Sequence, residues 1–251
     1  MSREQQEIAT PAGSSPPASP PASPPADRTA GFLAAAYDAF AVTYERNRGH
    51  FDMTDVLGDF RARLPAAGDL LDLGCGAGEP FARDFVERGW GVTGVDVSRA
   101  MLDLAARYVP QMNRIEGDMR SVELAPNAFD AICAVYSVFH VPVVDHPALF
   151  ARMRNWLRPG GVLLFTYATR SYTGQDRFDG HMSFMGRELY YSHATPSELV
   201  AQLHAAGLEL VEARERSLGG ETFLWVTARA GDDSRADATP EMRVEVPNTG
   251  T

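Results

Sequence analysis

The stretch LLDLGCGAGEP, at residues 70–80, constrains the fold of this chain more than any other segment. Its short apolar run predicts a buried strand over residues 70–73, and three glycines follow at alternate positions. A helix is expected over residues 80–88, because Pro80 suits a first turn whose amide has no partner. A glycine-rich turn from a strand into a helix brings backbone amides close to a nucleotide-like ligand.

Strand and helix patterns alternate along the rest of the chain. This alternation predicts an α/β fold with a doubly wound, mostly parallel sheet. The last two strands are joined by a Gly219-Gly220 turn, so they must be antiparallel. Ser98, Asp145 and Thr195 are predicted to cap helices. The other expected elements are strands at residues 91–95, 112–116, 128–135, 162–168, 208–214 and 222–228, and helices at residues 32–46, 53–64, 98–108, 145–157 and 195–207.

The composition divides the chain into three parts. Residues 1–28 include a Pro/Ala/Ser-rich run with a repeated PPAS motif, which predicts a disordered tail because it has little to bury. Residues 231–251 are polar and lack a sustained apolar period, so a second flexible tail is expected there. One globular domain is therefore expected over residues 29–230.

Bulk composition narrows the range of partners. The net charge is −10 and there is no run of Lys or Arg, which disfavours a nucleic-acid substrate. The two cysteines do not support a disulfide framework and favour a cytoplasmic location. No apolar stretch reaches the roughly 20 residues needed to cross a bilayer, so no membrane span is expected. We expect no metal site, and the sequence does not determine the oligomeric state.

The glycine loop by itself leaves several ligands open. The spacing GxGxG is compatible with a dinucleotide, with another nucleotide or with a merely tight turn. A nicotinamide site prefers GxGxxG, which would require glycine at the position of Glu79. A P-loop would require Gly-Lys-Ser/Thr after the turn, and this pattern is absent.

Two acids and a methionine extend the site that the loop suggests. Asp96 ends the second strand, where a carboxylate can accept two hydrogen bonds from a ribose diol. Asp118 follows the third strand at the same sheet edge and could accept a bond from an exocyclic amine. Met101 could lie on the face of a purine ring. A turn role for Asp118 and helix packing for Met101 are the alternatives, but together with the loop these residues predict an adenosine pocket.

Five motifs then occur in a recognisable order and spacing. LLDLGCGAGEP, GVTGVDVSRAML, EGDMRSVEL, FDAICAVYSVFHV and LRPGGVLLF resemble those of the class I S-adenosylmethionine-dependent methyltransferases. The resemblance covers residues 32–228. It implies a Rossmann-like, seven-stranded sheet with the last strand antiparallel and helices on both faces, and S-adenosyl-L-methionine as the cofactor.

The resemblance also implies roles for individual residues. The stretch YDAFAVTYERN resembles the lid helix of the small-molecule branch, and the lid helices would span residues 29–66. Tyr37 and Tyr44 would close over the cofactor carboxylate, with core packing as their alternative. The remaining implied contacts are Asp72, Gly74 and Gly76 with the methionine part, Asp96 with the ribose, Val97 and Met101 with the adenine, Asp118 and Met119 with the adenine amine, and Ala134 and Val135 with the methionyl end.

The acceptor of a methyl group must lose a proton if it is a hydroxyl or an ammonium, and histidine suits that task. His140 follows the fourth strand and is predicted to face the substrate; a turn-capping role is the alternative. Residues 169–194 form a long connection rich in aromatic residues, Met and His, which predicts a substrate cover; a hydrophobic flap that packs on the sheet is the alternative. Tyr191 and His193 of this cover are further candidates for proton acceptors or orienting groups.

We therefore expect methyl transfer to an oxygen or nitrogen atom of a small molecule, such as a secondary metabolite. Another S-adenosylmethionine-dependent reaction on the same fold is the first alternative, and the cofactor product distinguishes it. A non-catalytic cofactor-binding protein is a second alternative, although its glycine loop should then be degraded. A nicotinamide-dependent dehydrogenase is a third, and a titration with reduced cofactor tests it.

Overall fold

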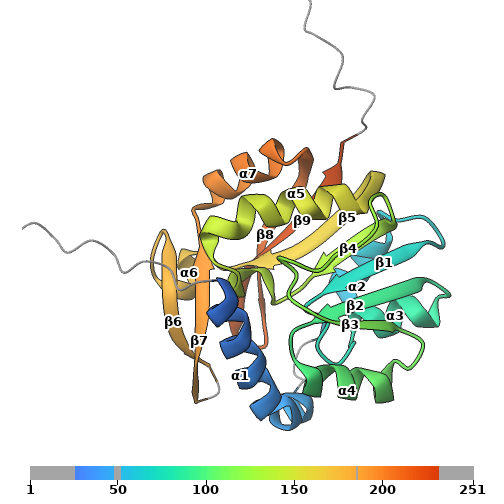
Figure 1. The fold of residues 1–251 in the computed structure, drawn as a ribbon. Coiled ribbons are helices and arrows are strands. Elements are labelled where there is room, and N and C mark those ends of the chain that lie inside the picture. Colours follow the sequence, from blue (N-terminus) through green and yellow to red (C-terminus); the bar gives the residue numbers. More distant parts are fainter. Residues whose placement is uncertain (1–25, 48–51, 185, 232–251) are drawn as a thin grey trace, which may run out of the picture.

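The computed structural model describes residues 26–47, 52–184 and 186–231. Within them, a seven-stranded sheet has the order β3-β2-β1-β4-β5-β9-β8 (Figure 1). The predicted number of strands is confirmed. Its strands are β1 (Asp69–Leu73), β2 (Gly91–Asp96), β3 (Asn113–Glu116), β4 (Phe129–Ala134), β5 (Leu157–Tyr167), β8 (Leu208–Leu218) and β9 (Glu221–Ala230).

The pairing of the strands places a crevice beside β1. Strands β1 to β5 pair in parallel, whereas β9 runs antiparallel to both β5 and β8, as predicted. The chain moves outward from β1 through β2 to β3, then returns to the other side of β1 with β4. Ligands bind at such a switch point, beyond the carboxyl ends of the strands.

Helices cover both faces of the sheet, which confirms the predicted layers (Figure 1). On one face Phe60, Phe85 and Leu102, from three helices, share a core with the strands. On the other face Phe150 and Leu203 do the same. The helices are α1 (Ala26–Asn47), α2 (Thr54–Arg61), α3 (Phe81–Glu87), α4 (Arg99–Tyr108), α5 (His146–Trp156), the one-turn α6 (Arg170–Thr173) and α7 (Pro196–Ala205), with 3₁₀ turns η2 (Val138–His140) and η3 (Val143–Asp145).

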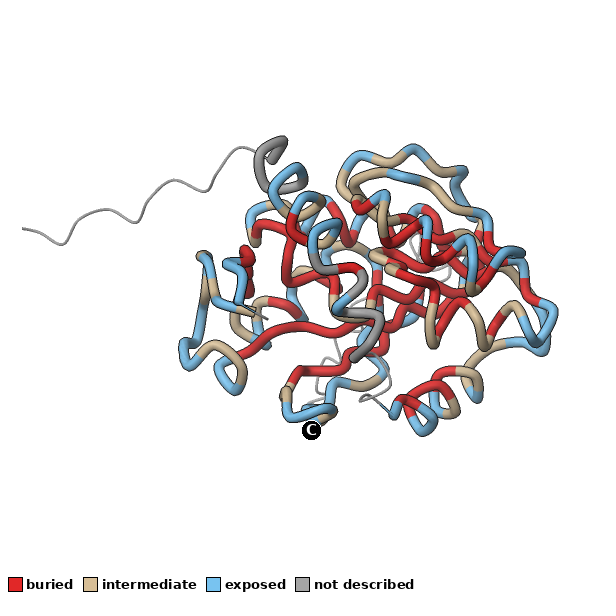
Figure 2. Tube along the Cα trace, turned by 90° about the horizontal axis from the view of Figure 1, so that it is seen from below, coloured by how far each residue is buried: buried red, intermediate tan, exposed pale blue. Residues whose placement is uncertain are grey.

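The central strands β1 and β4 are mostly apolar because both of their faces are covered. Leu70 belongs to one core cluster and Leu71 to the other, and both are completely buried. Figure 2 shows buried chain through the centre of the molecule and exposed chain at its periphery. Burial of each such leucine contributes about 1.5–3 kcal/mol to stability.

The helix caps only partly follow the sequence predictions. The Ser98 side chain accepts the Met101 amide and caps α4, as predicted. Thr195 and Glu198 form the predicted capping box at α7. The prediction for Asp145 was wrong: it occupies the position before α5 but makes no side-chain cap.

Residues 169–194, which the sequence analysis treats as one long connection, are largely ordered into secondary structure. They contain α6 and an antiparallel hairpin of β6 (Phe178–Phe184) and β7 (Arg187–His193). Every second residue of β6 is exposed, whereas β7 is buried from Leu189 to His193. The hairpin therefore packs through β7 and turns one face of β6 outward.

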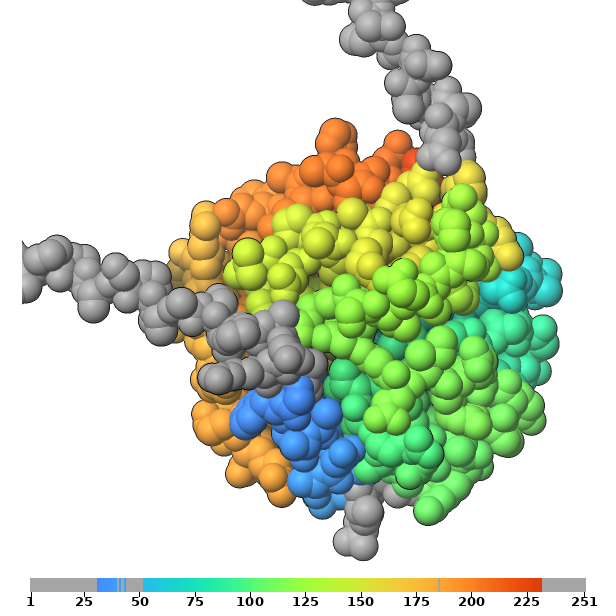
Figure 3. All heavy atoms as spheres, in the orientation of Figure 1, coloured from blue at the N-terminus to red at the C-terminus, as the bar shows by residue number. Residues whose placement is uncertain are grey.

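Helix α1, which we call the lid helix, lies between this hairpin and α4 (Figure 3). Its Ala36 packs in a cluster with Tyr191 of β7, and its Ala41 packs in a cluster with Met101 of α4. Helix α2 was also predicted to belong to the lid, but its Phe60 packs into the core on one face of the sheet. The two predicted tails, apart from residues 26–28 in α1 and Gly231, lie outside the described residues.

In the described part of the chain, no helix has the length and apolar character needed to cross a membrane.

Replacing Thr195 with Ala should lower the free energy of unfolding by about 1 kcal/mol, because it removes an N-cap. Urea denaturation followed by circular dichroism measures the change. Glu209→Gln is the matched control, because Glu209 is exposed and lies outside the capping box. An unchanged midpoint in Thr195→Ala would contradict the contribution of the cap.

Candidate functional site

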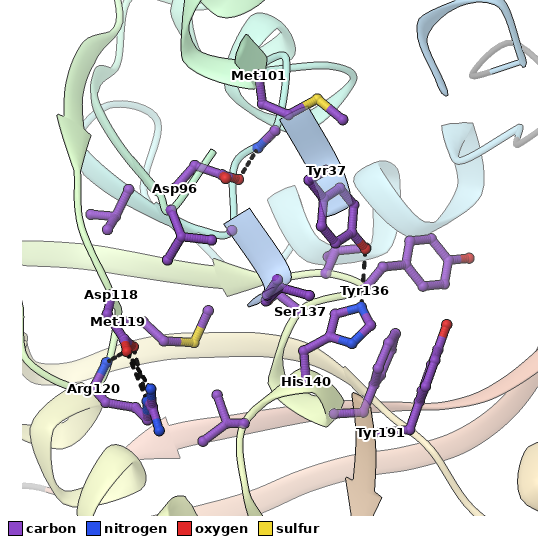
Figure 4. Close-up of a pocket in the computed structure, with 18 of the residues that line it drawn as sticks. Tyr37, Asp96, Met101, Asp118, Met119, Arg120, Tyr136, Ser137, His140 and Tyr191 are labelled. Atoms are coloured by element: carbon purple, nitrogen blue, oxygen red, sulfur yellow. Dashed lines mark hydrogen bonds and ion pairs between the residues drawn. The ribbon is translucent and has the colours of Figure 1, made fainter. Parts of the chain in front are cut away.

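A pocket lies at the carboxyl ends of β1, β2 and β4, beside the lid helix (Figure 4). One end is lined by Gly74, Asp96 and Asp118, which the sequence analysis assigned to an adenosine site. The other end is lined by aromatic side chains from the lid helix, the β6–β7 hairpin and β9. The predicted residues that line the pocket are Tyr37, Gly74, Gly76, Asp96, Val97, Met101, Asp118, Met119, Val135, His140 and Tyr191.

The loop after β1 needs glycine for two separate reasons. Gly74 has φ +75°, a left-handed conformation, and a Cβ added there would lie 2.4 Å from the Cβ of Ser137. Its N–H donates to the Val95 carbonyl at 2.7 Å, which holds the loop against β2. Gly76 also has a positive φ, of 52°, but a Cβ added there would meet nothing within 4 Å. The backbone at Gly76 is therefore open to a ligand.

The Asp96 carboxylate organises this loop. Its Oδ2 accepts the Gly76 N–H and its Oδ1 accepts the Ser98 N–H, both at 2.8 Å. Burial raises the pKa of Asp96 to about 6, and the two backbone bonds oppose that shift. Each oxygen keeps a second lone pair, so the carboxylate can still accept hydrogen bonds from a diol.

Asp72 and Ala134 are not among the residues that line the pocket. Asp72 is 5% exposed, and burial raises its pKa to about 7, with the Cys133 side chain as a hydrogen-bond partner. Ala134 is completely buried in the core. Both side chains are buried, and the ligand contacts expected of them stay predictions.

Asp118 is held by an arginine that the sequence analysis did not single out. The Arg120 Nε lies 3.1 Å and 2.9 Å from the two carboxylate oxygens of Asp118. The same guanidinium also donates to Asp145 at 3.1 Å, which explains why Asp145 does not cap α5. Arg120 lines the pocket beside Met119. The only signal in the sequence for this role of Arg120 is its position two residues after Asp118.

Two consecutive residues fasten the lid helix to opposite sides of the pocket. The Asp38 Oδ1 accepts the Ser98 hydroxyl at 2.6 Å and the Ala100 N–H at 3.0 Å. The Tyr37 hydroxyl lies 3.0 Å from the His140 Nε2 (Figure 4). Sequence reasoning missed Asp38. Tyr44 belongs to α1, but its side chain is outside the described part of the structure.

His140 is placed in the pocket wall with both ring nitrogens engaged. Its Nδ1 lies 2.7 Å from the Tyr190 carbonyl oxygen, which can only accept, so Nδ1 carries the proton. Nε2 is then the acceptor for the Tyr37 hydroxyl. The ring is 5% exposed, and burial lowers its pKa to about 4. His140 is therefore neutral at physiological pH.

The two cover residues differ in position. Tyr191 lines the pocket and stacks on Phe139, with ring centroids 5.3 Å apart. Burial raises the pKa of Tyr191, so its hydroxyl stays protonated. His193 does not line the pocket: its Nε2 lies 2.7 Å from the Thr173 hydroxyl and its Nδ1 lies 3.0 Å from the Ala194 carbonyl. The structure thus does not bring His193 to the expected substrate site.

The backbone at the tip of β4 is strained where it faces the pocket. Tyr136 has φ +56°, which is uncommon for a residue with a side chain. Its N–H donates to the Thr166 hydroxyl at 2.6 Å, and the preceding and following residues, Val135 and Ser137, both line the pocket. Strain of this kind clusters at ligand sites. No pattern in the sequence signals it.

The His140 ring should be the neutral Nδ1–H tautomer from pH 8 down to pH 5. Long-range ¹⁵N–¹H correlation spectra report the tautomer directly, with His140→Phe used for assignment. Because the folded-state pKa, about 4, lies below the unfolded value of about 6.5, this group stabilises the fold above pH 6.5. That contribution is lost as pH falls toward 4. Protonation of His140 near pH 6.5 would contradict the burial argument.

The comparisons with known proteins agree with the site. Residues 44–213 match the family model described as a methyltransferase domain. A malonyl-[acyl-carrier protein] O-methyltransferase of Serratia marcescens is 37% identical over 139 residues, which cover 51% of this chain and 52% of that enzyme. The chain thus spans about half the length of the curated relatives it matches.

Two solved structures show the same fold. One is 1,6-didemethyltoxoflavin-N1-methyltransferase of Burkholderia thailandensis with bound 1,6-didemethyltoxoflavin and S-adenosylhomocysteine (TM-score 0.65, 21% identity, 88% of this chain and 94% of that chain). The other is the [4+2]-cyclase SpnF (TM-score 0.63, 20% identity, 80% of this chain and 95% of that chain). With its family model, sheet order and glycine loop, the chain belongs to the class I S-adenosylmethionine-dependent methyltransferases.

Proposed function

We propose that this protein transfers the methyl group of S-adenosylmethionine to a nucleophilic atom, oxygen or nitrogen, of a small molecule. One observation carries the proposal: a glycine loop with an acid at the tip of β2 and a chamber of aromatic side chains share a single pocket under the lid helix. A donor bound at the first end would present its reacting group to an acceptor bound at the second.

The residues present fit the cofactor. The backbone at Gly76 is open, because a Cβ added there would meet nothing within 4 Å, whereas a side chain at position 74 would collide with Ser137. In our proposal the Asp96 lone pairs take the ribose hydroxyls, and Val97 and Met101 flank the adenine. When bound, S-adenosylmethionine supplies an electrophilic methyl group on a positively charged sulfur.

The remaining task of the protein is positioning and exclusion of water. Positioning alone can contribute about 7–11 kcal/mol to lowering a barrier. The lid helix closes one side of the pocket through Tyr37 and Asp38, and Tyr191 and Phe139 close another. An enclosure made from one chain in this way suits a small acceptor. The net charge of −10 also disfavours a nucleic acid.

Proton removal falls to the Tyr37–His140 pair in this proposal. The Tyr37 hydroxyl donates to Nε2 of the neutral His140, so its oxygen can accept a proton from an acceptor as its own proton passes to the ring. Burial makes His140 a weak base, with a pKa of about 4. The pair therefore suits an acceptor whose proton becomes acidic as its bond to the methyl group forms.

A second candidate function is another reaction that uses the same cofactor pocket. The fold that this chain shares with a [4+2]-cyclase is the reason to retain this candidate. Mass spectrometry of the cofactor product distinguishes the two, since methyl transfer yields S-adenosylhomocysteine. Incubation of the protein with methyl-labelled cofactor and a small-molecule extract tests the proposal. Label in a small product together with S-adenosylhomocysteine supports it, and conversion of the cofactor to any other product contradicts it.

Calorimetry should show binding of S-adenosylmethionine and S-adenosylhomocysteine and no binding of NAD. Asp96→Ala should weaken binding of S-adenosylhomocysteine by about 1.5–3 kcal/mol, the range for hydrogen bonds to a charged group. Asp103→Ala is the control, because Asp103 is an exposed acid of α4 outside the pocket. Unchanged affinity in a folded Asp96→Ala protein would place the ribose elsewhere.

With an acceptor identified by the labelled product, His140→Gln should lower the turnover rate by about 10²–10⁴. Tyr37→Phe should lower it too, because it removes the hydroxyl that links the ring to the pocket. Both losses should shrink at high pH, where the acceptor loses its proton unaided. If His140→Gln kept the full turnover rate across the pH range, proton removal through His140 would be contradicted. Positioning of the acceptor would then be the whole mechanism.

A further inference from the structure

Four aromatic rings from four different elements meet at the end of the pocket away from Asp96. Phe139 of η2 stacks on Phe223 of β9 and on Tyr191 of β7, with centroid separations of 4.8 Å and 5.3 Å and interplanar angles of 13° and 8°. Tyr172 of α6 lies 4.4 Å from Phe223. All four rings line the pocket. We call these four residues the aromatic chamber.

Among the described residues that line the pocket, one carboxylate, that of Glu221, lies beside the aromatic chamber. Strand β9 is antiparallel to β5, so it begins at the sheet edge where the parallel strands end, and Glu221 is its first residue. The side chain is half-buried and lines the pocket, and its Oε1 accepts the Tyr172 hydroxyl at 3.3 Å. Among the described residues, Glu221 forms no ion pair.

The charges of the pocket are separated along its length. Arg120 lines the opposite end and is already engaged by Asp118 and Asp145. At the chamber end the described lining residues include no Lys or Arg, and His140 is neutral. Glu221 is therefore the one charged group of this end in the part of the structure that is described.

These features select the charge of a ligand. A partly buried carboxylate without a cation is energetically costly, and a ligand that brings a positive charge removes that cost. Aromatic faces carry negative electrostatic potential and attract cations. A neutral ligand would leave the carboxylate uncompensated, and an anion would be repelled by it.

We propose that the aromatic chamber and Glu221 bind the protonated amine of the small-molecule substrate. The ammonium lies against the Glu221 carboxylate, and its carbon skeleton lies along Phe139 and Tyr191. This inference rests on the proposed function and narrows its substrate to basic amines.

The test uses three probes that share one skeleton: 2-phenylethylamine, 2-phenylethanol and 3-phenylpropanoate. Calorimetry at pH 7.5 with protein saturated with S-adenosylhomocysteine measures their dissociation constants. The wild type should bind the amine about tenfold or more tightly than the alcohol, and the anion more weakly than either. Glu221→Gln should weaken amine binding about tenfold and leave alcohol binding within about twofold.

Glu209→Gln is the matched control, because Glu209 is an exposed acid of β8 outside the pocket. Amine and alcohol of equal affinity, an amine affinity unchanged by Glu221→Gln, or no binding of the amine to the wild type would each overturn the inference. If Glu221→Gln fails to fold, the ratio of the amine affinity to the alcohol affinity in the wild type decides the test. Failure to bind S-adenosylhomocysteine would instead overturn the proposed function, so the two failures are distinguishable.

Discussion

The Asp96 carboxylate is the interaction on which the rest of the site depends. Its two oxygens hold the glycine loop through Gly76 and the start of α4 through Ser98. The hydroxyl of Ser98 in turn donates to Asp38 of the lid helix. One side chain at the end of β2 therefore connects the loop, a sheet-covering helix and the lid. This is why Asp96 stabilises the pocket around it as well as lining it.

The reversed last strand contributes to the site as well as to the sheet. A parallel strand at the position of β9 would start at the opposite edge, far from the carboxyl ends of β1 and β4. Because β9 is antiparallel, its first residues, Glu221 and Phe223, reach the pocket. The hairpin inserted before α7 supplies Tyr191 to the same place. The aromatic end of the pocket thus receives residues from elements that follow β5 in the chain.

Much of this fold could be predicted because its signals are local. Apolar runs located the strands, and the caps at Ser98 and Thr195 are formed by residues three positions apart. The contacts that shape the site are not local: the Tyr37 hydroxyl and the His140 ring are 103 residues apart, and nothing in either segment indicates the other. The β6–β7 hairpin escaped prediction because only every second residue of β6 is even partly buried, and those positions include Gly180.

The fastening of the lid helix has a mechanical consequence. Tyr37 and Asp38 are consecutive residues, so their side chains leave α1 about 100° apart and cannot move independently of its axis. One holds η2 and the other holds the start of α4, on opposite sides of the pocket. A rotation of α1 that breaks one contact displaces the other. A displacement of α1 away from the pocket would therefore break both contacts together rather than one after the other.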